Sequence, residues 1–138
     1  MQEPAFPETK PLHLTRLRTR WSDEDNQAIL NNAVYLTLME EARHAYFSAH
    51  GLLEGNRFPF VLSQSNVRYL QTGRGGADVL VETCTSHIGT SSFVQCYRIR
   101  CQASGELWCQ AEALLVCVDG AGKSCPMSPA FRAALAAP

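Results

Sequence analysis

One long helical segment, followed only by strand-like segments, is the feature that most constrains how this chain can fold. Residues 32–49 carry apolar side chains at steps of three and four, the period of an α-helix with one broad buried face. Asn31 or Asn32 suits the helix start, because an Asn side chain accepts hydrogen bonds from first-turn N–H groups. Gly51 is expected just beyond the helix end. The apolar positions are Val34, Tyr35, Leu38, Met39, Ala42, Ala45, Tyr46 and Ala49, with Leu36 and Phe47 widening the face.

Strands are expected on both sides of this helix. Residues 12–21 alternate and contain Thr and Trp, which favours a strand. Four further strands are expected after the helix, at 58–70, 79–87, 92–101 and 107–118, and the last three are joined by tight turns. Residues 129–135 form a short helix or tail. Hairpin-linked strands beside a single helix predict an α+β fold, with one curled antiparallel sheet covering one long helix.

Composition excludes several classes of protein. The 138 residues suit a single domain, predicted for residues 12–138 behind a flexible N-terminal arm of residues 1–11. The net charge of −1 offers no polybasic surface, so neither nucleic acid nor an anionic membrane is an expected partner. No apolar run approaches the ~20 residues of a membrane span. The N-terminus lacks the apolar core of a secretion signal, so a cytoplasmic location is the default expectation.

The six cysteines are expected to be reduced and structural. None forms a CxxC pair and no His lies at ligand spacing nearby, so no metal site is predicted. Most lie inside apolar strand patterns, where a reduced Cys acts as a small hydrophobe. Three arginines, Arg16, Arg18 and Arg20, share one face of the first strand. They form either a solvated face or a patch for a phosphorylated ligand.

Three acids, Asp23, Glu24 and Asp25, lie in the loop before the helix. They can be a solvated loop whose charge suits the positive end of the helix dipole. Alternatively, one carboxylate near the helix N–H groups can activate water or attack directly, while those N–H groups stabilise an oxyanion. Composition alone leaves both interpretations open.

The surrounding residues resemble a known family. The chain has D-x-D at Asp23 and Asp25, N-N-x-x-Y from Asn31 to Tyr35, and then Glu-Glu-Ala-Arg at 40–43. This pattern is similar to that of the 4-hydroxybenzoyl-CoA thioesterase family of hotdog-fold proteins. Weaker similarities follow at 66–69, 73–78, 89–93, 111–113 and 126–135, so that the resemblance covers residues 12–135.

The resemblance implies a hotdog fold, in which a five- or six-stranded sheet wraps one helix, and hydrolysis of acyl-CoA thioesters. Asp25 corresponds to the family's catalytic carboxylate, and the backbone N–H of Asn32 to an oxyanion donor. Coenzyme A is then part of the substrate, so no cofactor is expected. A homodimer or homotetramer is implied, because the family binds its substrate across a dimer interface. The candidate substrate contacts are Tyr35, Arg68, Arg74 and Ser92, although Tyr35 also fits a core position.

Two departures from the family keep alternatives open. Many members have Gly-His where this chain has Ala28-Ile29, and Ala resists a backbone conformation that Gly adopts easily. A non-catalytic acyl-thioester binding protein is therefore the second hypothesis. A hotdog dehydratase is the third, and it would need His44 or His87 as a base. Glu41 is expected to form a surface pair with Arg43 or a neighbour.

Overall fold

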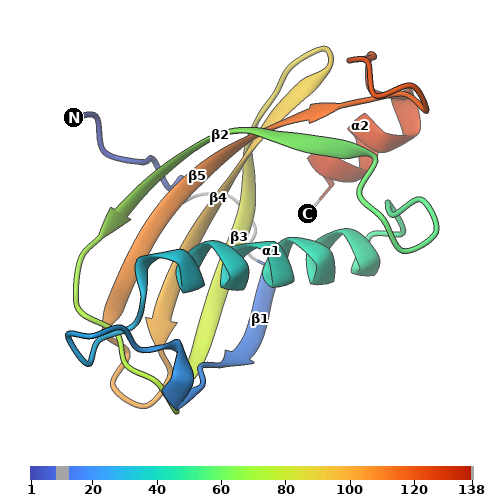
Figure 1. Ribbon diagram of the computed structural model, residues 1–138. Coiled ribbons are helices and arrows are strands. Elements are labelled where there is room, and N and C mark those ends of the chain that lie inside the picture. Colours follow the sequence, from blue (N-terminus) through green and yellow to red (C-terminus); the bar gives the residue numbers. More distant parts are fainter. Residues whose placement is uncertain (9–12, 138) are drawn as a thin grey trace.

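A five-stranded antiparallel sheet curls around one long helix in the computed structural model, which describes residues 1–8 and 13–137 (Figure 1). This confirms the predicted α+β hotdog fold. In chain order the elements are β1 (His13–Arg18), the 3-10 helix η1 (Trp21–Asp23), α1 (Asn32–Ala49), β2 (Phe60–Tyr69), β3 (Asp78–Ile88), β4 (Ser92–Cys101), β5 (Leu107–Cys117) and α2 (Pro129–Ala136).

The order of strands across the sheet is β1-β3-β4-β5-β2, and every neighbouring pair is antiparallel. Tight turns join β3, β4 and β5, as the sequence predicts. The strand that follows the helix, β2, crosses to the far edge and pairs with β5, so that Asn66 lies opposite Glu112. β1 and β2 are therefore the two edges, and β2 offers one side of its backbone for further pairing.

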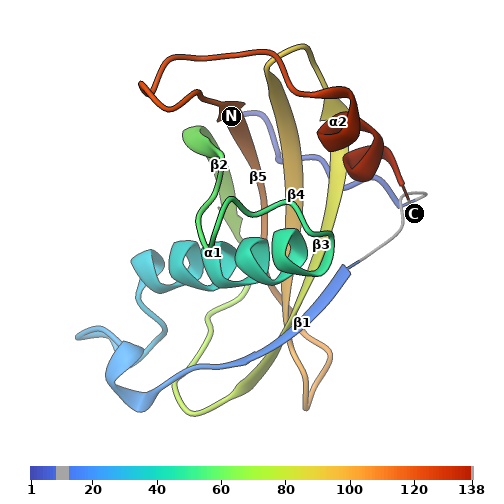
Figure 2. The same cartoon turned by 90° about the vertical axis from the view of Figure 1, so that its right-hand side faces the viewer.

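Helix α1 lies across the concave face of the sheet (Figure 2). It begins where the sequence predicts, because the Asn31 side chain accepts a 2.9 Å hydrogen bond from the N–H of Ala33. It ends before Gly51, which adopts a φ of 67°. Its buried face packs on the sheet residues Val81, Tyr97, Ile99, Ala111 and Ala113 through Leu38, Met39 and Ala42.

The prediction that Leu36 belongs to the buried helix face is wrong. The side chain is 44% exposed, and it borders a surface groove instead of the core. Phe47, the other residue expected to widen the face, is fully buried.

A second apolar cluster closes the far end of the sheet. Phe47 from α1 meets Phe60 from β2, Phe93 from β4 and Phe131 from α2, with ring centroids 4.8–6.0 Å apart. Helix α2 starts at a Ser128 cap, whose hydroxyl accepts from the N–H of Phe131. Within the described residues, neither α1 nor α2 is long and apolar enough to cross a membrane.

The cysteines form no disulfide, and all six lie in the described part of the chain. Five are buried in the strands β3, β4 and β5, and Cys125 is half-buried. Burial raises the pKa of the Cys109 thiol to about 12 and that of Cys117 to about 11. Those two thiols are protonated at neutral pH, as expected for small apolar fillers.

Residues 1–8 lie on the outer face of the sheet, away from α1. The Pro4 carbonyl accepts a 2.7 Å hydrogen bond from Gln110, and Pro4 is buried. The Arg98 guanidinium lies 3.8 Å from the centroid of the Phe6 ring and pairs with Glu8 at 2.7 Å. These contacts belong to the segment predicted as a flexible arm, whose residues 9–11 are outside the described residues.

Candidate active site

The first acid of the loop before α1, Asp23, is held by Arg20. Its carboxylate accepts hydrogen bonds from the Arg20 backbone N–H at 2.8 Å and from the guanidinium at 2.8 and 3.2 Å. Burial alone would raise the pKa of Asp23, but the hydrogen bonds and charge of Arg20 outweigh that effect and lower the pKa. Its carbonyl also accepts from the N–H of Asn31, the helix cap. Asp23 is therefore engaged in shaping the loop.

The third acid, Asp25, sits in a tight hairpin with its carboxylate partly exposed. Glu24 bridges to Leu30 at the hairpin base, and the Asp25 N–H donates to the carbonyl of Ile29 at 2.9 Å. One carboxylate oxygen accepts a 2.7 Å hydrogen bond from the N–H of Gln27. This contact orients the carboxylate and leaves its other oxygen without a partner among the described residues.

Ala28 adopts a left-handed backbone conformation at the tip of this hairpin. Its φ is 60°, and it is the one residue other than Gly with a positive φ in the described part of the chain. Its N–H donates to the Asp25 carbonyl at 3.0 Å, which closes the turn. The conformation that Ala28 was expected to resist is therefore present, at some cost in strain.

The Gly-rich turn between β2 and β3 anchors the loop. The Leu30 N–H donates to the carbonyl of Gly73 at 2.9 Å, and the Gly75 N–H donates to the Glu24 carboxylate at 2.9 Å. A Cβ at Gly75 would lie 2.5 Å from the Cα of Trp21 and closer still to the carbonyl oxygen of Arg20. The backbones approach so closely that only Gly fits, which gives this turn a direct role in placing Asp25.

The start of α1 faces a small hollow beside the loop. The hollow has a volume of about 250 Å³ and is lined by Ile29, Leu30, Asn32, Tyr35, Tyr69, Leu70, Gln71 and Thr72. Asn31 caps the N–H of Ala33, whereas the N–H of Asn32 meets no acceptor within the described residues. That N–H is one of the unsatisfied donors of a helix start, available to an oxyanion.

Tyr35 is nearly fully buried behind this hollow. Its ring packs edge-on against Tyr69, with centroids 5.1 Å apart, and the Tyr69 hydroxyl donates to the Asn32 carbonyl at 3.1 Å. Burial raises the pKa of Tyr35 to about 12. Tyr35 is thus a core residue that also forms part of the hollow's wall.

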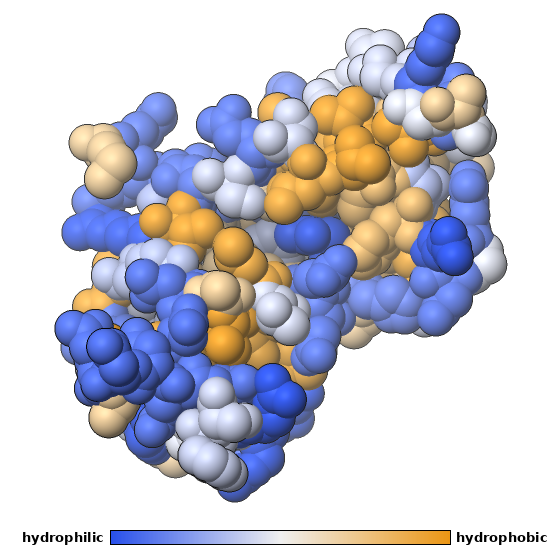
Figure 3. All heavy atoms as spheres, viewed as in Figure 1, coloured by the Kyte–Doolittle hydropathy of each residue, from blue (hydrophilic) through white to orange (hydrophobic). Residues whose placement is uncertain are grey.

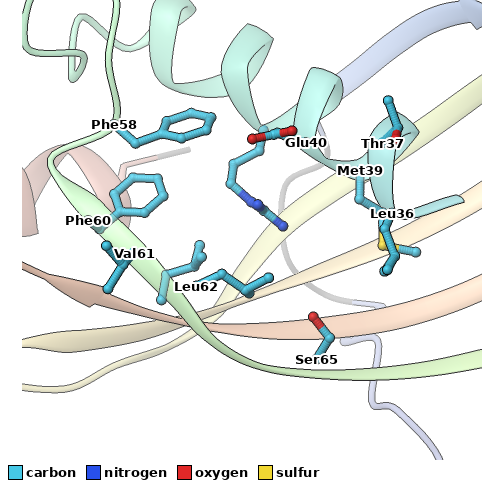
Figure 4. Close-up of a pocket in the computed structure, with 11 residues that line it drawn as sticks. Leu36, Thr37, Met39, Glu40, Phe58, Phe60, Val61, Leu62 and Ser65 are labelled. Atoms are coloured by element: carbon cyan, nitrogen blue, oxygen red, sulfur yellow. The ribbon is translucent and has the colours of Figure 1, made fainter. Parts of the chain in front are cut away.

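A larger groove follows along the seam between α1 and β2. It has a volume of about 370 Å³, and its walls include Leu36 and Met39 on the helix and Phe60, Leu62 and Ser65 on β2. Figure 3 shows apolar surface gathered along this seam, and Figure 4 shows the labelled side chains facing one another across it. One charged residue of the groove, Arg43, is buried.

Of the partners expected for Glu41, Arg43 is wrong, and the option of another neighbour stays a prediction. Arg43 donates from Nε to the hydroxyl of Tyr97 on β4 at 2.8 Å, beneath the helix. A cation on the apolar stripe, four residues after Met39, was a signal that the sequence carried for this buried role.

Three of the predicted substrate contacts come from different parts of the fold. Arg74 adjoins the turn that holds the loop, exposed, with its guanidinium 5.9 Å from the Trp108 ring centroid. Arg68 pairs with Glu3, among the N-terminal residues on the outer face. Ser92 lies opposite Val116, seven residues or about 23 Å along β5 from Cys109, the residue opposite Tyr69. One chain thus brings Arg74 near the loop, but not Arg68 or Ser92.

Two of the first strand's arginines have acidic partners. Arg18 pairs with Asp78 at 2.9 Å, and Arg20 is engaged with Asp23.

The histidines considered for a dehydratase lie away from the loop. His44 contacts Asn56 at 3.0 Å and lies about 18 Å along the helix from Asn32, and His87 is exposed near the far end of β3.

Comparison with known proteins gives the class of this chain. Residues 19–135 match the model of the thioesterase-like superfamily, and the chain belongs to that family. No curated protein matches the sequence. A putative thioesterase from Pseudomonas aeruginosa is 31% identical, with a TM-score of 0.79 over 88% of this chain and 96% of that one.

Two further solved structures are similar. A thioesterase from Thermus thermophilus, in complex with coenzyme A and Zn, is 29% identical, with a TM-score of 0.83 over 93% of this chain and 99% of that one. The 4-hydroxybenzoyl-CoA thioesterase from Pseudomonas sp. strain CBS-3 is 18% identical, with a TM-score of 0.80 over 89% and 98%. These findings confirm the predicted family and its enzyme class, a thioester hydrolase.

Proposed function

We propose that the chain hydrolyses acyl-CoA thioesters to a free acid and coenzyme A, with Asp25 as general base or nucleophile. The proposal rests on one observation, which is that the acids Asp23 and Asp25 have different surroundings. Asp23 is bound by Arg20, whereas Asp25 keeps a partly exposed carboxylate in a hairpin that leads to the unsatisfied N–H of Asn32. A carboxylate and an oxyanion donor on one short loop are what acyl transfer to water requires.

As general base, Asp25 would take a proton from water while the water oxygen attacks the thioester carbonyl carbon. The carbonyl oxygen would then carry negative charge, which the Asn32 N–H stabilises at the positive end of the helix dipole. Collapse of this intermediate breaks the C–S bond and releases coenzyme A as a thiolate, which is protonated. As nucleophile, Asp25 would form a mixed anhydride that water cleaves in a second step.

Substrate binding is proposed at several further positions. Arg74, exposed beside the loop, is suited to a phosphate of coenzyme A, because a guanidinium binds phosphate through paired hydrogen bonds. Arg68 remains a weaker candidate for the same role, since it pairs with Glu3 on the outer face. Tyr35 would shape the hollow that receives the thioester.

A homodimer, or a tetramer built from it, is part of the proposal. β2 is an edge strand, and Val61 and Leu62 on it are 53% and 51% exposed. A second copy that pairs with this edge would satisfy its free backbone groups. Ser92 lies too far from the helix start of its own chain, so it would contribute to a site completed by a second copy.

The non-catalytic alternative rests on Ala28 and on Ile29 in place of a His, and the left-handed conformation of Ala28 weakens the first of these grounds. The test is thiol release from a broad panel of acyl-CoAs by the wild type and Asp25→Ala. We expect turnover of some panel members, reduced in the variant by about 10²–10⁴-fold. Equal rates for the two proteins, both at background on every thioester, would refute a catalytic role.

A further inference from the structure

Arg43 is a buried cation with no acidic partner. The residue is 7% exposed and borders the groove between α1 and β2. It forms no ion pair with a carboxylate of the described residues. Its charge therefore faces the groove without a compensating carboxylate.

Only a neutral side chain holds the guanidinium in place. Nε donates to the Tyr97 hydroxyl at 2.8 Å, and that hydroxyl donates to Oε1 of buried Gln95 at 2.8 Å. A guanidinium has five N–H donors, so most of those of Arg43 are left for another acceptor. Burial raises the pKa of Tyr97 to about 12 even beside Arg43, so the phenol stays protonated and supplies no negative charge.

The terminal nitrogens of Arg43 are not enclosed. They meet no acceptor among the described residues and border the groove, where water or a bound anion reaches them. Glu40 borders the same groove, but its side chain is exposed and forms no ion pair with Arg43 within the described residues. A guanidinium binds a carboxylate through two parallel hydrogen bonds, so a carboxylate is the anion that suits this position best.

The groove and the hollow at the helix start follow one another along α1 and are lined by separate sets of residues. Leu36, Met39 and Arg43 follow Asn32 at steps of four, three and four, and therefore lie on one stripe of α1. On β2, the inward-facing residues Tyr69 and Ser65 run alongside. Eleven residues of helix separate Asn32 from Arg43 by about 16 Å.

We propose that this groove binds the acyl part of the substrate and that Arg43 binds a carboxylate at its distal end. The preferred substrates are then acyl-CoA thioesters of dicarboxylic acids. Apolar side chains of the groove would surround the acyl chain, with Asp25 near the thioester at one end and Arg43 at the carboxylate of the other end. An extended chain covers about 1.2 Å per bond, so the 16 Å span corresponds to about thirteen bonds. The Arg43 side chain leans toward the start of the helix, which shortens the acyl chain that fits to roughly ten to twelve carbons. This inference rests on the proposed hydrolysis at Asp25.

The test compares matched thioesters of coenzyme A that differ only at the distal end, decanoyl against decanedioyl, with eight- and twelve-carbon pairs alongside. For the wild type we expect a higher kcat/KM with the dicarboxylic member. Arg43→Met keeps the length of the side chain without its charge. It is expected to lower kcat/KM for decanedioyl-CoA by about tenfold to hundredfold, the range for a hydrogen bond to a charged group. Its effect on decanoyl-CoA should stay within about threefold.

Arg16→Met is the matched control, because Arg16 is an exposed arginine on β1, at the opposite edge of the sheet from β2, and should not alter the preference. Tyr97→Phe keeps the cation and loosens its position, so it should retain part of the preference. Thermal melts of each variant report folding. A wild type that does not favour the dicarboxylic member, or an equal loss on both substrates in Arg43→Met, would overturn the inference.

A binding measurement separates this inference from the proposed function. Free decanoate and the neutral decanamide, which has the same chain length, are added to wild type and Arg43→Met, and the shift in Tm is recorded. A larger shift with decanoate, lost in the variant, supports the carboxylate site even if no thioester is hydrolysed. Equal shifts for the two ligands would refute the site, whatever the turnover.

Discussion

Replacing Ala28 with Gly is expected to stabilise the protein. Ala28 has a φ of 60°, a left-handed conformation that costs an L-residue about 1–2 kcal/mol and costs Gly almost nothing. Gly also makes the unfolded chain more flexible, which returns roughly 0.4–1 kcal/mol to the unfolded state. The net gain in unfolding free energy is therefore about 0.5–1 kcal/mol, equivalent to a rise in Tm of about 2–4 °C for a chain of this length.

Urea denaturation at equilibrium measures this difference in unfolding free energy. The slope of unfolding free energy against urea concentration should be the same in the two proteins, so that the shift in midpoint reports stability. Ala33→Gly is the matched control. Ala33 is equally exposed but lies in the first turn of α1, where Gly should destabilise by about 0.5–1 kcal/mol. The two substitutions thus have opposite expected signs. Destabilisation by Ala28→Gly of the same size as by Ala33→Gly would show that the loop backbone is not left-handed at residue 28.

Three further perturbations probe other parts of the account. Gly75→Ala forces a Cβ against the backbone of Trp21, so it should lower thioesterase activity and reduce the unfolding free energy by about 1–3 kcal/mol. Gly120→Ala is the control, because its Cβ meets open space. It should change the unfolding free energy by less than about 0.5 kcal/mol in the same urea experiment. The pKa of Asp23 is lowered in the folded state, so its ionised carboxylate stabilises the protein above the ordinary pKa of 3.8, and this stabilisation is lost as pH falls through the lowered pKa. In melts from pH 6 to pH 2, Asp23→Asn should therefore lose stability less steeply with acid than the wild type does. Removal of residues 1–8 deletes the contact of Phe6 with Arg98 and should lower the unfolding free energy by about 0.5–2 kcal/mol, with an unchanged melt contradicting a stable position for this segment.

The local elements could be predicted closely because they depend on neighbours in the sequence. The predicted helix 32–49 matches α1 at both ends, since Asn31 and Gly51 are strong local signals. The predicted strand 92–101 coincides with β4, and the others differ from the observed strands by no more than three residues at either end. Alternation along each strand reports which side chains face the core, and that pattern is visible without a structure.

Contacts between distant segments were not visible in the same way. Nothing in residues 58–70 indicates that β2 crosses to β5 at the far edge, because register and order depend on the packed sheet. The burial of Arg43 depends on Tyr97, 54 residues away. The division of roles between Asp23 and Asp25 depends on local hydrogen bonds with Arg20 and Gln27, and the D-x-D pattern alone does not distinguish them.

The role of Asp25 is tested most directly by removing its charge while keeping its shape. In Asp25→Asn, the side-chain oxygen can still accept from the N–H of Gln27, so the turn is preserved. Asp119→Asn is the matched control, because Asp119 is an exposed aspartate that accepts from the N–H groups of Ala121 and Lys123 in a similar turn.

The measurement is kcat/KM for acyl-CoA hydrolysis by wild type, Asp25→Asn and Asp119→Asn, with melts to confirm that all three fold. We expect a loss of about 10²–10⁴-fold in Asp25→Asn alone, the range for a missing catalytic base. A folded Asp25→Asn protein that hydrolyses the thioester as fast as the wild type and Asp119→Asn would contradict it.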